Sequence, residues 1–151
     1  MAKKKKRVCL WGRILFVLYI ALAVYFLFFS DSFDRTMISD SYRYNLEPFA
    51  EIKRFIINRE QLGIKSLMIN IVGNVICFMP FGFLLPTITK NKIVKNVVGV
   101  FVCTVLFTLA VETIQLVTKV GAFDIDDIML NTLGGVLGYL IMRVTLHKYT
   151  L

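Results

Sequence analysis

Histidine and cysteine are scarce in this sequence, and each shortage excludes a class of function. Of its 151 residues, one is a histidine and three are cysteines. His147 stands alone near the C-terminus, so no histidine-based catalytic site can be assembled. Cys9, Cys77 and Cys103 lie in separate apolar runs, which excludes CxxC metal spacing and a disulfide framework. We expect these cysteines to be small packing residues.

Acidic residues are also few, since 10 Asp and Glu face 18 Lys and Arg, for a net charge of +8. Such an excess can indicate a nucleic-acid partner. Here, however, five basic residues form one block, Lys3 to Arg7, directly before an apolar run. A block in that place sets membrane topology and contacts anionic lipid headgroups, so we expect membrane lipids and no nucleic acid as partners.

Long apolar runs dominate the rest of the chain, which is 57% hydrophobic with a mean hydropathy of +0.70. The runs cover residues 8–29, 67–85, 97–117 and 128–146, and a helix needs about 20 such residues to cross a bilayer. We predict an all-α integral membrane protein with four transmembrane helices in one domain, residues 1–151. A signal peptide is the alternative for the first run, but that run is longer than an apolar signal core and ends in the bulky "YFLFFS".

Loop charges predict the orientation of these helices. The N-terminal block and the loop "TITKNKIVKN", with Lys90, Lys92 and Lys95, should both be cytoplasmic. With four spans, both termini are then on the cytoplasmic side of the cell membrane. The loop over residues 30–66 and the loop "TKVGAFDIDD" would then face outward. In the first of these, "EPFAEIKRFIIN" predicts a short helix with Pro48 in its first turn. That helix would either lie in the outer membrane interface or cap the bundle without touching lipid.

Three of the predicted spans carry polar or small residues along one helical face. The stripes are Asn70, Gly73, Asn74 and Cys77; Thr104, Thr108, Glu112 and Gln115; and Asp127, Asn131, Gly134, Gly135 and Gly138, which contains a GxxxG motif. Polar residues in membrane helices avoid lipid by facing the bundle interior, and small residues let backbones approach closely. We therefore expect the three stripes to face one another near the outer membrane surface.

Glu112 is the most informative member of these stripes, because an ionisable residue within a membrane span is costly and often functional. The amide side chains can instead simply hold the helices together by hydrogen bonds. Both interpretations stay open at this point. The candidate ligand-binding residues are Asn70, Asn74, Glu112, Gln115, Asp124, Asp127 and Asn131, and Glu112 is the candidate catalytic acid or base.

Two further motifs have structural and functional interpretations. The closely spaced Asp124, Asp126 and Asp127 suit a hard cation such as Mg²⁺ or Ca²⁺, but the other ligands of a calcium loop are absent. Alternatively, Asp124 caps the fourth helix, with the other two aspartates in its first turn. We predict no metal and no other cofactor. In "MPFGFLLP", Pro80, Gly82 and Pro86 are expected to kink and then end the second helix.

The order of these motifs resembles the VanZ-like family of bacterial membrane proteins. The resemblance covers about residues 45–139 and is carried by "YNLEPF", "NIVGNVICFMPFGFLLP", "VETIQL" and "FDIDDIMLNTLGGVLGY". Its motif positions here are Asn45, Pro48, Asn70, Asn74, Pro80, Gly82, Glu112, Gln115, Asp124, Asp127, Asn131 and Gly134. Many members carry an arginine in the loop before the aspartates, where this chain has Lys119, Val120 and Gly121.

The family is named for a protein that gives bacteria low-level resistance to teicoplanin-type glycopeptide antibiotics. The resemblance therefore implies a multi-pass protein of the bacterial cell membrane that lowers glycopeptide action at the cell surface. We rank first a non-enzymatic site that binds a lipid-linked or cell-wall component, or the glycopeptide, at the outer face. An enzyme acting on a lipid-linked headgroup ranks second, and an assembly partner that uses the Gly134–Gly138 stripe ranks third.

Overall fold

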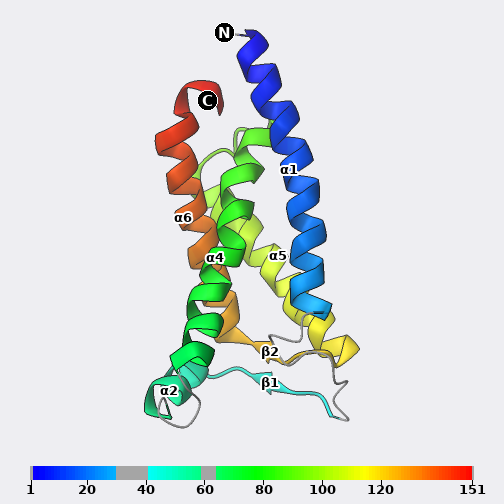
Figure 1. Ribbon diagram of the computed structural model, residues 1–151, viewed down its shortest axis with the longest axis vertical. Helices are drawn as coiled ribbons and strands as arrows, with labels where there is room; N and C mark the ends of the chain where they lie inside the picture. Colours follow the sequence, from blue (N-terminus) through cyan, green and yellow to red (C-terminus); the bar gives the residue numbers. More distant parts are fainter. Residues whose placement is uncertain (1, 30–40, 59–63, 151) are drawn as a thin grey trace.

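Four long helices form the body of the molecule in the computed structural model, which describes residues 2–29, 41–58 and 64–150 (Figure 1). They are α1 (Ala2–Phe29), α4 (Ile64–Ile88), α5 (Val97–Thr118) and α6 (Ile125–Thr150). Each contains a segment long and apolar enough to cross a membrane. The predicted all-α membrane class with four spanning helices is confirmed.

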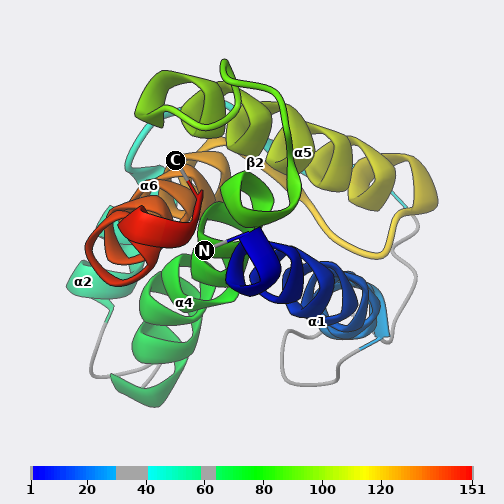
Figure 2. The same ribbon diagram turned by 90° about the horizontal axis from the view of Figure 1, so that it is seen from above.

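The α4–α6 pair is the centre of the bundle, with the most extensive contact between any two elements. Seen from above, α1 and α5 lie beside this pair (Figure 2). Aromatic side chains fill the space between them: Phe81 stacks on Phe107 with ring centroids 4.7 Å apart, and Phe16 of α1 lies 5.9 Å from Phe81. Phe78 is fully buried nearby, so the apolar core joins α1, α4 and α5.

Glycines allow α4 and α6 to approach closely. A Cβ on Gly138 would lie 1.9 Å from the carbonyl oxygen of Met79, and one on Gly134 would lie 2.2 Å from that of Val75. Likewise, a Cβ on Gly82 would lie 1.7 Å from the carbonyl oxygen of Gly135. The GxxxG stripe is thus occupied by α4 of the same chain, which removes the basis for its use by a partner protein.

The expectation that Pro86 ends the second helix was wrong. Helix α4 continues past Pro86 to Ile88, with Pro80 also inside it. Membrane helices tolerate internal proline because neighbouring groups satisfy the freed backbone atoms. Gly82 supplies close packing against α6.

A small cap closes the end of the bundle that lies opposite both chain termini (Figure 1). It consists of β1 (Tyr44–Asn45), β2 (Phe123–Asp124) and α2 (Ala50–Ile57), with the two strands pairing in parallel. The short helix was predicted from the sequence and the strands were not. Of the predicted outer loop, residues 30–40 and 59–63 lie outside the described residues.

Pro48 does not lie in the first turn of α2, contrary to the prediction. The helix begins at Ala50, and Phe49 before it adopts a left-handed backbone with φ 66°. Pro48 therefore belongs to the turn that leads from β1 into α2. Helix α2 contacts both α4 and α6, which agrees with its interpretation as a cap.

Candidate functional site

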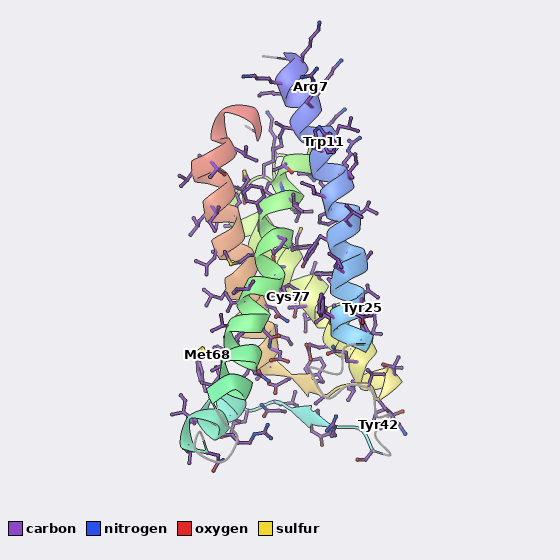
Figure 3. All side chains as sticks on the ribbon, viewed as in Figure 1. Arg7, Trp11, Tyr25, Tyr42, Met68 and Cys77 are labelled. Atoms are coloured by element: carbon purple, nitrogen blue, oxygen red, sulfur yellow. The ribbon has the colours of Figure 1, made fainter. Side chains whose placement is uncertain are left out.

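The amide and carboxyl side chains of the three predicted stripes gather toward the capped end of the bundle. In Figure 3, Tyr42 marks this end, and Arg7 and Trp11 mark the opposite end. Buried polar residues of this region include Asn74, Glu112, Gln115, Asp124, Asp126 and Asn131. Hydrogen bonds join α4 to α6 and α6 to α5 through these side chains, which confirms that the stripes face one another.

Glu112 is held at the base of the cap and is 2% exposed. Its Oε2 accepts a hydrogen bond from the main-chain N–H of Asp124 at 3.1 Å. The carboxylate thus joins α5 to the residue that precedes α6. A buried acceptor with a hydrogen-bond donor avoids much of the cost of desolvation, which explains how the fold accommodates a glutamate here.

Asp124 connects the strand pair to α6. Its Oδ1 accepts a hydrogen bond from the side-chain Nδ2 of Asn45 at 3.1 Å, and another from the main-chain N–H of Asp126 at 2.8 Å. The second bond is the predicted N-cap of α6. Burial raises the pKa of the Asp124 carboxyl above its ordinary value of 3.8. Its two hydrogen bonds and the charge of Arg54 act in the opposite direction.

Asp126 and Asp127 have different partners from Asp124. The carboxylate of Asp126 accepts hydrogen bonds from the main-chain N–H groups of Phe49 and Ile52, so it caps α2 from α6. Asp127 accepts a hydrogen bond from Nδ2 of Asn74 and links α6 to α4. Among the described residues, no three His, Cys, Asp or Glu side chains are grouped to hold a metal ion.

Gln115 and Asn131 each donate a hydrogen bond to a neighbouring helix. Nδ2 of Asn131 donates to the hydroxyl of Thr108 at 2.8 Å, which links α6 to α5 as the stripes predicted. Nε2 of Gln115 instead donates to the carbonyl oxygen of Leu27 in α1 at 2.9 Å. The polar cluster therefore includes a fourth helix, which the three-stripe expectation missed because a main-chain acceptor carries no residue-type signal.

A polar pocket of about 300 Å³ opens between the cap and the helices. Its lining is Arg43, Tyr44, Asn45, Arg54, Asn70, Val120, Gly121, Ala122, Asp124 and Asp127. We call this the capped-end pocket. Asn70, Asp124 and Asp127 were predicted as ligand-binding residues and line it. The other predicted residues, Asn74, Glu112, Gln115 and Asn131, do not line it, and hydrogen bonds hold them among the helices around it.

The two arginines that line this pocket were not predicted from the sequence. Arg43 directly precedes β1 and Arg54 lies within α2, in a segment of mixed charge, so neither stood out in the sequence. Lys119, in the loop where the family resemblance implies an arginine, lies 4.9 Å from the ring centroid of Tyr42 and does not line the pocket. The guanidinium charge beside the aspartates therefore comes from a different part of this chain.

The capped-end pocket combines two guanidinium groups, two carboxylates and two amides. Arginine binds carboxylate or phosphate through paired hydrogen bonds, and carboxylates bind amines and hydroxyls. A few converging polar groups in a concave site are typical of ligand binding. The arrangement suits recognition of a polar ligand that carries charges of both signs.

Comparison with known proteins gives a consistent picture. The sequence model of the VanZ/LLP1 family matches residues 16–146. Protein VanZ of Enterococcus faecium is 30% identical over 129 residues, which cover 84% of this chain and 70% of that protein. No solved structure matches the chain. With a family match over most of its length, including the capped-end pocket, this chain belongs to the VanZ/LLP1 family.

Proposed function

We propose that this protein lowers the action of teicoplanin-type glycopeptides at the bacterial cell surface, by binding a ligand in the capped-end pocket. The similarity to Protein VanZ of Enterococcus faecium supports the cellular role. The observation that carries the site is the pocket itself, in which Arg43 and Arg54 share one space with Asp124 and Asp127.

Charge placement supports an outward-facing pocket. Lys90 and Lys95 line one pocket together with Lys5 and Lys6, so the loop and the N-terminal block lie at the same end of the bundle. This end also holds both termini, and the capped-end pocket lies at the other (Figure 1). Basic segments are retained in the cytoplasm. We infer that both termini are cytoplasmic and that the capped-end pocket faces outward, where glycopeptides act.

The pocket chemistry narrows the ligand class. Cell-wall peptides and glycopeptides carry both carboxylate and amino groups, and such a ligand would meet complementary charges in this pocket. Lipid-linked wall precursors add a phosphate, which is a further partner for arginine. We therefore propose a lipid-linked or cell-wall component, or the glycopeptide itself, as the ligand.

A second candidate function is enzymatic, on a lipid-linked headgroup. One observation favours it: burial raises the pKa of Asp124, a pocket-lining carboxyl, and a raised pKa suits a general acid. In that account Glu112 would act as acid or base, or would support Asp124 in that role through the hydrogen bond between them.

The test is the teicoplanin minimum inhibitory concentration in a susceptible Gram-positive host carrying wild type, Glu112→Gln or empty vector, with membrane abundance measured by immunoblot. If the pocket acts by binding, wild type should raise the minimum inhibitory concentration and Glu112→Gln should keep that rise. Glutamine retains an acceptor oxygen for the Asp124 N–H. Loss of the rise in an equally abundant Glu112→Gln would favour the enzyme. No rise with well-expressed wild type would contradict the proposed role.

A further inference from the structure

A second polar pocket, of about 540 Å³, lies at the opposite end of the bundle from the capped-end pocket. It is lined by Lys5, Lys6, Cys9, Leu10, Arg13, Thr87, Thr89, Lys90 and Lys95. We call it the basic pocket. Its cations come from two segments far apart in the sequence, the start of α1 and the loop between α4 and α5.

The charged side chains that line the basic pocket are all cations. They are Lys5, Lys6, Arg13, Lys90 and Lys95, and among the described residues no Asp or Glu lines the space. The sequence explains this, because every Asp and Glu of the chain falls within residues 31–60 or 112–127. Like charges collected around one space repel one another, and an anion placed between them lowers their energy.

Close packing fixes the two walls of the pocket relative to each other. A Cβ on Gly12 would lie 2.8 Å from the hydroxyl oxygen of Thr87, so α1 crosses the end of α4 at short range. One turn earlier, the thiol of Cys9 donates to the carbonyl oxygen of Ile88 at 3.9 Å. The cations of α1 are therefore held beside those of the loop by the fold itself.

The α4–α5 loop is also ordered by its own side chains. Oδ1 of Asn91 accepts a hydrogen bond from the N–H of Ile93 at 2.9 Å, and Oδ1 of Asn96 accepts one from the N–H of Gly99 at 2.8 Å. The second bond caps the start of α5. Lys90 and Lys95 thus project from a defined turn.

The pocket opens beside the lipid-facing surface of α1. Leu10 lines it and is 57% exposed, and Ile14 continues the same helical face one turn further along the span. Trp11, exposed at this end of the molecule (Figure 3), is a residue type enriched at membrane interfaces. A headgroup in the basic pocket would place its acyl chains along Leu10 and Ile14.

We propose that the basic pocket binds the phosphate of an anionic phospholipid, bridging α1 and the α4–α5 loop. Basic pockets between membrane helices on the cytoplasmic side are suited to such headgroups. The bridge matters for α1 in particular: 11% of its span is buried within the protein, against 33–44% for the other three. A bound lipid would fasten this loosely packed helix to the rest of the bundle. The inference is independent of the capped-end pocket.

The experiment measures thermal unfolding of the full-length protein in a neutral detergent while phosphatidylglycerol, phosphatidylcholine or inorganic phosphate is titrated in. A ligand that binds the native state raises Tm in a saturable way. We expect phosphatidylglycerol alone to do so. An equal rise with phosphatidylcholine would contradict recognition of the charge, and an equal rise with inorganic phosphate would contradict the assignment to a lipid.

Two matched double variants separate the pocket from general surface charge. Lys6→Gln with Lys90→Gln removes two cations that line the pocket, and Lys4→Gln with Lys92→Gln removes two exposed cations of the same segments that do not. Each lysine that reaches the bound phosphate contributes a factor of about five in affinity, so the first pair, which lines the pocket, should weaken phosphatidylglycerol binding about 30-fold. The second pair should leave binding close to wild type. Equal losses in both pairs, or no loss in the first, would overturn the proposal.

Discussion

The main-chain N–H of Asp124 donates a hydrogen bond to Oε2 of Glu112 at 3.1 Å, and this bond joins α5 to the start of α6. Asp124 lines the capped-end pocket and Glu112 does not. The intramembrane glutamate therefore influences the pocket from outside its lining, by fixing the backbone from which a pocket carboxylate projects. Its role in positioning Asp124 follows from this geometry whether the site binds or catalyses.

Removing the Glu112 acceptor should destabilise the protein. Glu112→Ala leaves the buried N–H of Asp124 without this acceptor, which costs about 1–3 kcal/mol in the free energy of unfolding. Glu112→Gln keeps an acceptor oxygen and should lose much less. Thermal unfolding of both variants in detergent checks this, and equal losses in the two would show that the hydrogen bond is not what stabilises the fold.

Asp126 should control the attachment of α2 to the bundle. Asp126→Ala removes the acceptor for the N–H groups of Phe49 and Ile52, so the first turn of α2 should open more often. Hydrogen–deuterium exchange over residues 49–58 should accelerate, while exchange in the middle of α4 stays as in wild type. Unchanged protection of α2 in Asp126→Ala would contradict the cap.

Replacing single glycines by alanine should destabilise the protein only where the glycine packs against another helix. A Cβ on Gly138 would meet the carbonyl oxygen of Met79 at 1.9 Å, whereas a Cβ on Gly73 would meet nothing within 4 Å. Gly138→Ala should therefore destabilise by about 1–3 kcal/mol through overpacking. Gly73→Ala should be neutral or stabilising, since alanine is favoured over glycine in helices by up to about 1 kcal/mol. Comparable unfolding midpoints for the two variants would contradict the close α4–α6 contact.

The raised pKa of Asp124 predicts a pH-dependent difference between wild type and Asp124→Asn. Because the pKa is higher in the folded state than the ordinary 3.8, ionisation of this carboxyl opposes folding. The contribution of Asp124 to folding stability is most favourable below pH 3.8 and is lost as the pH rises through the folded-state pKa. Asn keeps an acceptor oxygen for Asn45 and Asp126.

The Asp124→Asn midpoint should therefore equal or exceed that of wild type at neutral pH. The difference between the two should shrink as the pH falls toward 3.8. Taking the difference between the two proteins cancels the titration of their shared carboxylates. A difference that grows on acidification would mean that the fold favours the charged form of Asp124.

The sequence predicted the features that depend on residue type. Apolar runs predicted the four spans, and helical spacing predicted the inward-facing Asn74, Thr108, Glu112 and Asn131. The N-cap role of Asp124 was also among the predicted alternatives, because its position before an apolar run is characteristic of caps. These features could be predicted because buried positions recur every three to four residues along a helix, and that spacing is visible in a single sequence.

Features that depend on main-chain partners far away in the chain were missed. Tyr44 and Asn45 pair with Phe123 and Asp124 through two-residue strands, which are too short to show an alternating pattern. The capping of α2 by Asp126 was missed for the same reason, since the main-chain N–H donors of Phe49 and Ile52 carry no residue-type signal. Arg54 lies on α2, and its place in the pocket lining depends on these contacts of β1 and α2 with β2 and α6.

The most direct test of the central claim, that the capped-end pocket carries the function, compares two neighbouring residues of α2. Arg54 lines the pocket, and Lys53 is exposed and does not. Arg54→Gln and Lys53→Gln each remove one positive charge, and both should leave membrane abundance unchanged. The measurement is the teicoplanin minimum inhibitory concentration at matched abundance. The account predicts that Lys53→Gln keeps the wild-type rise and that Arg54→Gln falls toward the empty-vector value; a full rise in Arg54→Gln would contradict it.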